Sequence, residues 1–331
     1  MGGTRRPSRR SVIEGAVALG AGASLFGGRA RAAGYPERAI TILCPFAAGG
    51  PTDLCARIVA AHLGQKLGQP AVVENKVGAG GNIALGMAAK AKPDGYTLLV
   101  CSSAYVVNPA LYTRSPFDPY KDFEPVAFFG ASPNVIAIRS ELGIKTMADF
   151  IARAKAEPDA FNYASPGAGT TPQLAVEVLK FRAGINITHV PFNGAAPAIQ
   201  AVLAGTTQLV GINLSSALPH IQSGALTGLV QTGATRWPAM SQVPTMAESG
   251  FDNAVSETFQ ALFAPAGTPA PILDVLTREG MAAFEAPDVR ERLVQAGFAV
   301  MPKGPDYLRQ RIAEEVPLWK EAVATAGVKV D

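Results

Sequence analysis

The most restrictive feature of this sequence is an alternation of short β-rich apolar runs with segments whose apolar residues recur at helical spacing. A first series predicts strands and helices in turn at residues 39–46, 52–67, 71–75, 80–91 and 96–102. A second series follows at residues 135–139, 146–156, 161–165, 170–182, 186–192, 194–204 and 207–213. Strands that alternate with helices pair in parallel, so the pattern predicts an α/β fold whose plan begins twice.

Two glycine-bearing loops occupy corresponding places in the two series, each between a predicted strand and the helix that follows it. The first is PFAAGGPTD at 45–53 and the second is SPGAGTTPQ at 165–173. Ligands of such sheets bind outside the carboxyl ends of the strands, and bare backbone N–H groups at a helix N-terminus suit an anion. Glycine also serves simply to permit a tight turn. Two such loops in corresponding places favour a ligand held between them.

The class of anion is narrowed by motifs that the sequence lacks. No G-x-x-x-x-G-K-[ST] run is present, and GAGGNI at 78–83 and GAGTTP at 167–172 both miss the G-x-G-x-x-G spacing, so nucleotide binding has no signature. A G-x-S-x-G elbow is also absent, and no serine has an evident histidine partner for hydrolysis. Asp53 is disfavoured as a catalytic group because an acid in the first turn of a helix usually stabilises the helix dipole.

The N-terminal segment has the organisation of an export signal. Four arginines within residues 5–10 precede the mildly apolar stretch at 15–28, and an A-x-A-like cleavage site follows at 30–33. The apolar stretch is about 14 residues long, short of the roughly 20 that a spanning helix needs. SRRSVI at 8–13 is similar to a twin-arginine signal. Residues 1–33 are therefore predicted to be a removable signal that directs the protein to the periplasm, the alternative being a disordered basic tail.

Removal of this segment changes the charge of the chain. The full sequence has 29 basic and 26 acidic residues, and residues 1–32 contain six arginines and one glutamate, which leaves 29 − 6 = 23 basic and 26 − 1 = 25 acidic residues. The formal charge of the mature chain is then 23 − 25 = −2. A basic balance would indicate nucleic acid or an anionic membrane as partner, and here it belongs to the signal, so no nucleic-acid partner is expected. The roughly 300 remaining residues suffice for two domains.

The cysteines and histidines show no pattern of a disulfide framework or a metal site. Cys44, Cys55 and Cys101 are odd in number and lack C-x-x-C spacing, so they are interpreted as small buried hydrophobes, with oxidation of one pair as the alternative. The three histidines are scattered without H-x-x-x-H spacing. We therefore expect neither a metal nor a cofactor.

Nine sequence blocks carry a resemblance to a known family. They are YPERAITILCPFAAGGPTDLCAR (35–57), ENKVGAGGNIA (74–84), KPDGYTLL (92–99), NPALY (108–112), SPGAGT (165–170), HVPFNGAAPAIQAVLAG (189–205), SALPHIQSGAL (216–226), VPTMAESGF (243–251) and LFAPAGTPAP (262–271). In this order they resemble the Bug-type, TctC-like periplasmic solute receptors, the substrate-binding component of tripartite tricarboxylate transporters. The resemblance covers nearly the whole mature chain.

The resemblance implies a two-domain, Venus-flytrap fold of type II-like plan with a ligand cleft between the domains. It assigns residues 34–133 plus 257–331 to one domain and residues 134–256 to the other. It further implies a monomer that binds a small carboxylate through backbone N–H groups of both glycine loops and passes it to integral-membrane transporter components. Catalysis is not implied. The remainder of the ligand, whether aliphatic, aromatic or amino-acid, is left open because backbone donors recognise the shared carboxylate.

Fifteen residues are predicted to bind the ligand when the family's motifs are carried over. One wall comprises Phe46, Ala48, Gly49, Gly50 and Asp53, the other comprises Ser165, Gly167, Gly169 and Thr170, and later strand ends supply Ser102, Ser103, Asn108, Phe192, Asn193 and Asn213. The alternative for the last six is loop capping or packing. If Asp53 faces the cleft it favours an ammonium group, whereas capping of its own loop makes it neutral to that choice; capping is favoured.

Some positions depart from the family pattern. Gln173 stands where a histidine is frequent, and Gln208 stands where an acid is common. Two other functions are compatible with the same residues. A receptor that reports its ligand to a sensor kinase would have the same sequence features, and an exported enzyme would need an activated partner for one of the cleft acids.

Overall fold

The computed structural model describes residues 2, 34–252, 254 and 256–326. Contacts group Tyr35–Asp331 as one compact unit, separate from Met1–Gly34. The predicted export signal, 1–33, lies outside the described residues except for Gly2. None of the described helices is both long enough and apolar enough to cross a membrane.

The strands and helices alternate as the apolar pattern predicts. The strands are β1 (Ile40–Cys44), β2 (Ala71–Asn75), β3 (Thr97–Ser102), β4 (Phe123–Arg139), β5 (Asn162–Ser165), β6 (Thr188–Pro191), β7 (Leu209–Asn213), β8 (Leu226–Gln231), β9 (Glu257–Pro265) and β10 (Ala299–Lys303). The helices are α2 (Pro51–Leu67), α3 (Asn82–Ala89), α4 (Ala104–Leu111), α5 (Met147–Ala156), α6 (Thr171–Ala183), α7 (Ala195–Leu203), α8 (Leu214–Gln222), α9 (Ala270–Glu285), α10 (Pro287–Gln295) and α11 (Pro305–Ala326). The predicted α/β alternation over 39–213 is confirmed.

Proline and glycine set the ends of the two helices that follow the glycine loops. Pro51 is the first residue of α2, where its fixed φ suits a helix and its missing N–H costs no hydrogen bond. The helix ends at Gly68, whose φ of 73° is left-handed. In α6, Pro172 lies in the first turn and Gly184 closes the helix with a φ of 61°. Both helices therefore start at a position that local sequence specifies.

The strands form one hydrogen-bonded series in the order β2-β1-β3-β9-β4-β7-β5-β6, with β8 and β10 also paired to β4. β1 is parallel to β2 and β3, and β5 is parallel to β6 and β7, whereas β9 is antiparallel to β3 and β4. The long strand β4 changes partner along its length. Pro133 is the last residue paired with β9, opposite Glu257, and Asn134 is the first paired with β7, opposite Asn213.

Four clusters of buried hydrophobic side chains flank these strands. In β3 the successive residues Leu98 and Leu99 enter different clusters, as expected where a strand is covered on both faces. α2 and α9 contribute to one of these clusters, and α3, α4 and α11 to the other. Apart from Leu174, the buried members of these two clusters come from residues up to Ala131 and from Phe259 onward. The other two clusters are made by α5 to α8, by β5, β7 and β8, and by the part of β4 that follows Asn134, together with loop residues.

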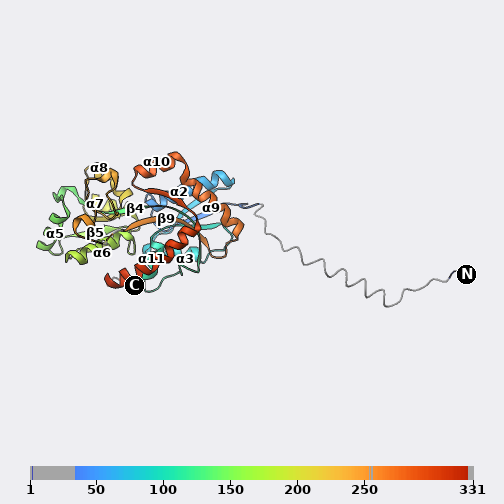
Figure 1. Ribbon diagram of the computed structural model, residues 1–331, viewed down its shortest axis with the longest axis horizontal. Helices are drawn as coiled ribbons and strands as arrows, with labels where there is room; N and C mark the ends of the chain where they lie inside the picture. Colours follow the sequence, from blue (N-terminus) through green and yellow to red (C-terminus); the bar gives the residue numbers. More distant parts are fainter. Residues whose placement is uncertain (1, 3–33, 253, 255, 327–331) are drawn as a thin grey trace. The chain divides into compact units, whose positions relative to one another are not determined.

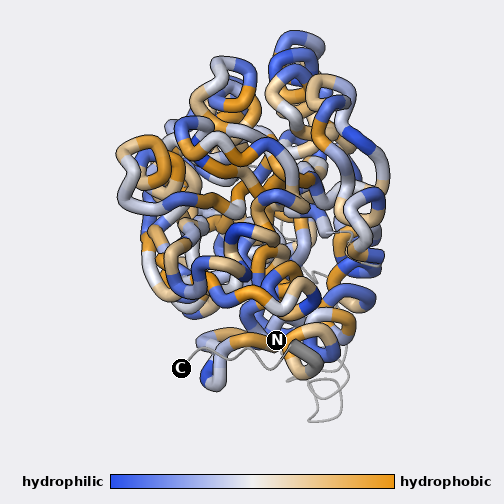
Figure 2. Tube along the Cα trace, turned by 90° about the vertical axis from the view of Figure 1, so that its left-hand side faces the viewer, coloured by the Kyte–Doolittle hydropathy of each residue, from blue (hydrophilic) through white to orange (hydrophobic). Residues whose placement is uncertain are grey.

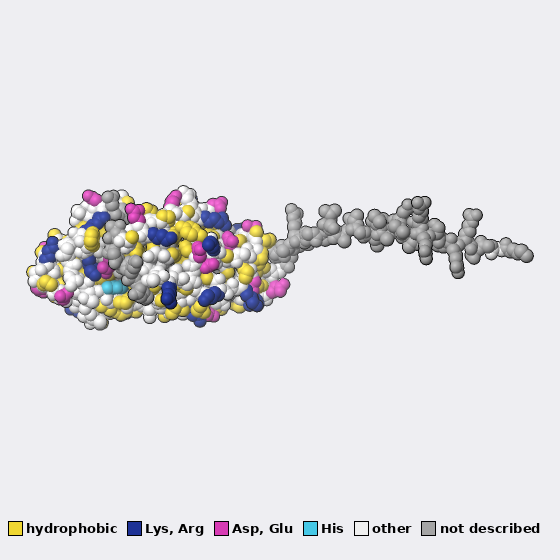
Figure 3. All heavy atoms as spheres, turned by 90° about the horizontal axis from the view of Figure 1, so that it is seen from below, with side chains coloured by type: hydrophobic (Ala, Val, Ile, Leu, Met, Phe, Trp, Pro, Cys, Tyr) yellow, Lys and Arg dark blue, Asp and Glu magenta, His cyan; other side chains and the backbone are white. Residues whose placement is uncertain are grey.

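The helices of the two series gather in different parts of the unit. Figure 1 shows α5 to α8 around β5 in one part and α2, α3 and α9 in the other, with β4 and β9 between them. In Figure 2 hydrophilic segments are frequent on the outer turns. On the face drawn in Figure 3, Lys and Arg side chains are interspersed with Asp and Glu. That face carries no continuous basic stripe of the kind that binds nucleic acid.

The three cysteines are buried and free, which confirms their interpretation as small buried hydrophobes. Burial raises the pKa of Cys44 to about 12, and it also raises the pKa of Cys55 and Cys101. The thiols are therefore protonated and inert at neutral pH.

Candidate functional site

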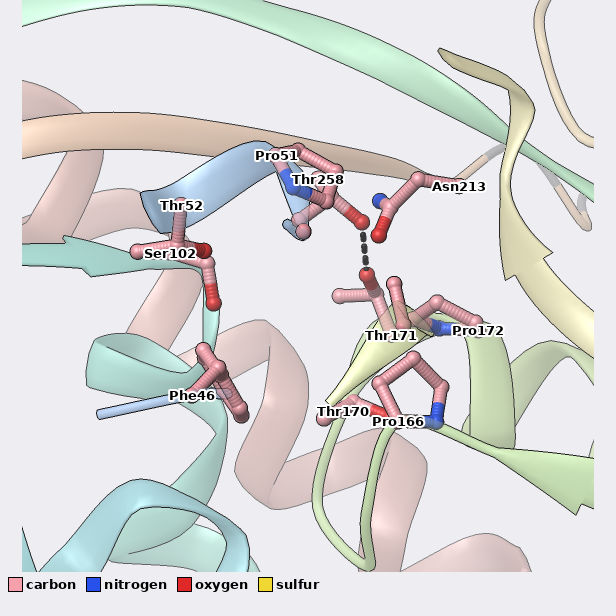
Figure 4. Close-up of a pocket in the computed structure, with 12 residues that line it drawn as sticks. Phe46, Pro51, Thr52, Ser102, Pro166, Thr170, Thr171, Pro172, Asn213 and Thr258 are labelled. Carbon is pink, nitrogen blue, oxygen red and sulfur yellow. Dashed lines mark hydrogen bonds between the residues drawn. The ribbon is translucent and has the colours of Figure 1, made fainter. Parts of the chain in front are cut away.

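A pocket lies where the two glycine loops approach each other (Figure 4). It comprises about 350 Å³ of space not filled by atoms, part of which is open to solvent. It is lined by Phe46, Gly50, Pro51, Thr52, Ser102, Pro166, Thr170, Thr171, Pro172, Ala195, Asn213 and Thr258. None of these lining residues is charged. Recognition in this pocket therefore depends on hydroxyl, amide and backbone groups.

Two helices begin at the pocket without a side-chain cap. Gly50 and Thr170 are the residues before α2 and α6, and neither helix has a side-chain hydrogen bond at its N-terminus. The first backbone N–H groups of a helix have no partner within the helix. The first turns of α2 and α6 therefore direct unpaired donors and the positive ends of two helix dipoles at one cavity, an arrangement that attracts an anion.

The first glycine loop is held by the Asp53 carboxylate, which is 3% exposed. Asp53 Oδ2 accepts hydrogen bonds from Gly49 N–H at 3.0 Å and from Arg57 Nε at 2.8 Å. Its Oδ1 accepts from Arg57 Nη2 at 3.0 Å and from Asn75 Nδ2 at 2.9 Å. Burial alone would raise the pKa of Asp53, but the hydrogen bonds from Arg57, Gly49 and Asn75 outweigh it and lower the pKa. Asp53 is thus ionised and caps its own loop.

The second glycine loop is held by neutral groups. The Oγ of Ser165 lies 2.7 Å from His189 Nε2 and accepts a hydrogen bond from Gly167 N–H at 3.2 Å. The hydroxyl of Thr170 donates to Gly167 O at 2.8 Å, and Gly169 N–H donates to Gln173 Oε1 at 3.4 Å. Burial lowers the pKa of His189 to about 4, so its imidazole is neutral at pH 7.

The Ser165–His189 pair corrects the expectation that no serine has a histidine partner. The two residues are 24 positions apart, and they meet because β5 and β6 are parallel neighbours. Ser165 is fully buried and is not among the residues that line the pocket. Its hydroxyl is enclosed by its own loop, so the pair supports the loop rather than presenting a nucleophile to the cavity.

The N–H groups of three predicted glycines have partners inside the protein. Gly49 donates to Asp53, Gly167 to Ser165, and Gly169 to Gln173. Among the described residues, Gly50 N–H and the N–H groups of the helix first turns have no such partner. Gly50 lines the pocket, so its amide stays available there together with the first turns of α2 and α6.

The structure brings only some of the predicted residues to the pocket. Phe46, Gly50, Ser102, Thr170 and Asn213 line it, whereas the other ten predicted residues do not: Ala48, Gly49, Asp53, Ser103, Asn108, Ser165, Gly167, Gly169, Phe192 and Asn193. Contact of any of the fifteen with a ligand stays a prediction.

Several of the ten residues outside the pocket have clear structural contacts. Ser103 Oγ accepts a hydrogen bond from Phe259 N–H at 2.9 Å. Phe192 packs against the cluster formed with α7 and α8. Asn108 Nδ2 donates to Gly80 O at 3.1 Å. These contacts match the capping and packing alternatives that the sequence left open.

Seven pocket residues were not predicted: Pro51, Thr52, Pro166, Thr171, Pro172, Ala195 and Thr258. All but Ala195 and Thr258 lie within the two glycine-loop motifs and could have been found by including every residue of those motifs. Ala195 follows the predicted strand that ends at Phe192. Thr258 has no local signal, because it reaches the pocket through the pairing of β9 with β4.

The two halves of the chain touch beside the pocket. Ala47 N–H in the first loop donates to Asn193 O at 2.8 Å. The hydroxyl of Tyr112 donates to Ala168 O in the second loop at 3.1 Å. Thr171 and Thr258 are joined through their hydroxyl groups. Among the residues that the structure describes, no group of three or more His, Cys, Asp or Glu side chains could hold a metal ion.

Comparison with known proteins identifies the family. The family model described as "Tripartite tricarboxylate transporter family receptor" (TctC) matches residues 55–328. The structure of the periplasmic binding protein BugD is similar with a TM-score of 0.86 and 33% identity, covering 89% of this chain and 99% of that one.

Two similar structures contain a carboxylate ligand. Rpa4515 of R. palustris with adipate has a TM-score of 0.84 and 31% identity, covering 89% of this chain and 99% of that one. MatC of Rhodopseudomonas palustris with bound malate has a TM-score of 0.83 and 33% identity, covering 87% and 100%. The chain therefore belongs to the TctC family of tripartite tricarboxylate transporter receptors, as a Bug-type member with the fold of the periplasmic binding proteins.

Proposed function

We propose that this protein captures a small carboxylate in the pocket and delivers it to the membrane components of a tripartite transporter. The observation that carries the proposal is the convergence of two uncapped helix N-termini, those of α2 and α6, on one cavity lined without any charged residue. Unpaired N–H donors and two dipole ends stabilise one carboxylate without a cationic side chain. The adipate and malate of two similar proteins support the same ligand class.

The protein acts in the periplasm as a monomer in this proposal, exported by the segment 1–33 through the twin-arginine route. Its two lobes are residues 34–133 plus 257–331 and residues 134–256. The change of partner in β4 between Pro133 and Asn134 supports this boundary, as does the separation of the buried clusters on either side of it. The pocket receives residues from both lobes, so a ligand between them is buried when they close.

A binding role is favoured over catalysis by the state of the reactive groups. Asp53 is ionised and fully occupied by Gly49, Arg57 and Asn75, so it has no free position for a substrate proton. Ser165 and His189 are paired behind the loop and not in the cavity. The pocket thus offers hydrogen-bonding groups and no activated nucleophile.

The test is thermal unfolding of the mature chain, first freed of co-purified ligand, against mono-, di- and tricarboxylates, aromatic acids and acidic amino acids. A ligand at one hundred times its Kd adds about 2.7 kcal/mol to the free energy of unfolding. We expect a clear rise in Tm with one class of acid and none with the corresponding carboxamides, which keep the shape and lose the charge.

A variant links this shift to the pocket. Asn213→Asp places a negative charge in the cavity at nearly constant volume, and we expect it to weaken carboxylate binding by more than tenfold. Gln222→Glu, the same amide-to-acid change on the exposed surface at the end of α8, is the control and should leave binding unchanged. A folded, empty protein whose Tm responds to no acid, or equally to acids and amides, would contradict the proposed function.

A further inference from the structure

One wall of the pocket is built from hydroxyl and amide groups that are linked to a buried asparagine. Thr171, Thr258 and Asn213 line the cavity, and Asn134 lies behind them with no exposed surface. Figure 4 shows the hydroxyls of Thr171 and Thr258 directed at each other, with the Asn213 amide beside them. Asn134 and Thr258 belong to β4 and β9, and Thr171 is the first residue of α6.

The direction of each hydrogen bond on this wall is determined. Asn134 Oδ1 accepts from the Thr258 hydroxyl at 2.8 Å and from Asn213 Nδ2 at 3.2 Å, which occupies both lone pairs of an amide oxygen. Asn134 Nδ2 donates to Ser256 Oγ at 3.3 Å, which fits the same orientation of the amide. A hydroxyl has one hydrogen, and that of Thr258 is used on Asn134. In the bond between the two threonines, Thr171 is therefore the donor.

The oxygens of this wall consequently act as acceptors toward the cavity, and the one hydrogen left unassigned among the side chains of Thr171, Thr258 and Asn213 is the second on Asn213 Nδ2. The hydroxyl hydrogens of Thr171 and Thr258 are both consumed inside the protein, so their oxygens have lone pairs left and no hydrogen to give. Asn213 Oδ1 receives no hydrogen bond from any residue that the structure describes. A carboxylate oxygen only accepts hydrogen bonds, so it gains nothing from these three atoms. A hydroxyl or an ammonium group donates to them.

We infer that this wall selects carboxylates that carry a hydroxyl or ammonium group over the unsubstituted acids of the same length. The inference rests on the proposed function. The first-turn donors of α2 and α6 bind the carboxylate, and the oxygens of the wall accept a hydrogen bond from the hydroxyl or ammonium group next to it. Thr258 is the specificity-determining residue, because its oxygen takes the hydrogen of Thr171 and gives its own to Asn134. A site with hydrogen-bond requirements of this kind rejects ligands that leave its polar groups unpaired.

The experiment measures Kd by calorimetry for matched sets of acids: propionate, lactate and alanine; succinate, malate and aspartate; glutarate, 2-hydroxyglutarate and glutamate. Within the set that binds, we expect the hydroxy or amino member to bind at least tenfold more tightly than the unsubstituted acid. The comparison between hydroxy and amino members identifies which donor the wall prefers. Equal binding of all three members would overturn the inference and leave the proposed function intact. No binding in any set would overturn the inference, and it would overturn the proposed function only if the wider panel of acids also fails to raise Tm.

Variants assign the preference to the wall. Thr258→Val keeps the shape and removes the oxygen, and we expect it to abolish the preference, so that the Kd values of the three members of a set converge. Thr258→Ser restores the oxygen and should restore the preference. Thr52→Val, the same change at another pocket threonine, is the matched control and should affect all members of a set by the same factor. Retention of the preference in folded Thr258→Val, verified by its Tm, would also overturn the inference.

Discussion

The two glycine loops perform the same task with different chemistry. Each ends a parallel strand and leads into a helix whose first turn faces the pocket. The first loop is held by an ionised carboxylate, that of Asp53, whose partner Arg57 is half exposed. The second is held by the uncharged pair of the buried Ser165 and the partly buried His189. Equivalent placement of two helix ends therefore does not require equivalent supports, and the two supports respond differently to substitution and to pH.

The largest difference in stability between the two loops is expected when alanine replaces glycine at corresponding positions. Gly49 and Gly169 have nearly the same φ, 84° and 85°, so alanine at either position carries the same backbone strain, about 1–2 kcal/mol. A Cβ at Gly49 would meet nothing closer than Ala196 Cβ at 3.7 Å, whereas a Cβ at Gly169 would lie 2.5 Å from Asn108 Oδ1. With overpacking added, we expect Gly169→Ala to lower the free energy of unfolding by about 2–4 kcal/mol. Urea denaturation of both variants measures it.

Each glycine variant is the control for the other, because only the surroundings of the added methyl group differ. Equal losses of stability would show that Asn108 moves aside without cost, and the second loop would then be as loosely packed as the first.

The second difference concerns pH. The pKa of His189 is about 4 in the folded protein and near 6.5 in the unfolded chain. Between these two pH values the unfolded chain binds a proton on this imidazole and the folded chain does not. The stability from this group is complete above pH 6.5 and is lost as pH falls to about 4, by up to about 3 kcal/mol. Glu177 and Lys180 face the ring with opposite effects. Asp53, whose pKa is lowered, keeps its contribution over this range and loses it only as pH falls through that lowered pKa.

The measurement is the free energy of unfolding against pH for the wild type and for His189→Gln. We expect the variant to be less dependent on pH between 6.5 and 4, and His220→Gln, a change at the end of α8, to keep the wild-type slope. An unchanged slope in His189→Gln would contradict the neutral, buried state of this imidazole.

The smallest difference is expected for the charge of the first loop. Asp53→Asn removes an ion pair and replaces one acceptor oxygen by an NH2 group, so two of the four hydrogen bonds are lost and two are weakened. Because Arg57 remains solvated, we expect a loss of about 1–2 kcal/mol by urea denaturation. Asp94→Asn, which breaks the exposed pair with Arg38, is the control and should cost less than about 0.5 kcal/mol. A loss at Asp53 no larger than at Asp94 would mean that the loop keeps its shape without the carboxylate.

The sequence predicts local elements well because their signals are local. Apolar periodicity together with Pro51 and Gly68 predicts α2 to within a residue. The segment 123–134 was not predicted as a strand, because Pro125, Gly130 and Pro133 interrupt its β pattern. It is a strand nevertheless, since pairing with β9 supplies hydrogen bonds that local preference does not reveal.

In the candidate site, too, features with a local sequence signal were predicted and features that depend on strand pairing were not. Residues inside the glycine-loop motifs were predicted to lie at the cleft, and Phe46, Gly50 and Thr170 line the pocket. The partner of Ser165 and the place of Thr258 depend on which strands are neighbours, and neither follows from spacing along the chain. Sequence patterns thus locate the loops, whereas the sheet order decides which side chains support them.

The position of β9 between β3 and β4 has a consequence for how the chain acquires its structure. Strands β5 to β8 and their partner segment of β4 all lie between residues 134 and 231, so this part has every strand it needs before β9 is synthesised. β3 instead pairs with β9, whose residues come about 160 positions later in the chain, as Phe263 does opposite Leu99. Contacts between residues far apart in the sequence form slowly. We therefore expect the part made of residues 134–231 to fold first, and the part that contains β3 to be completed only when β9 pairs with it.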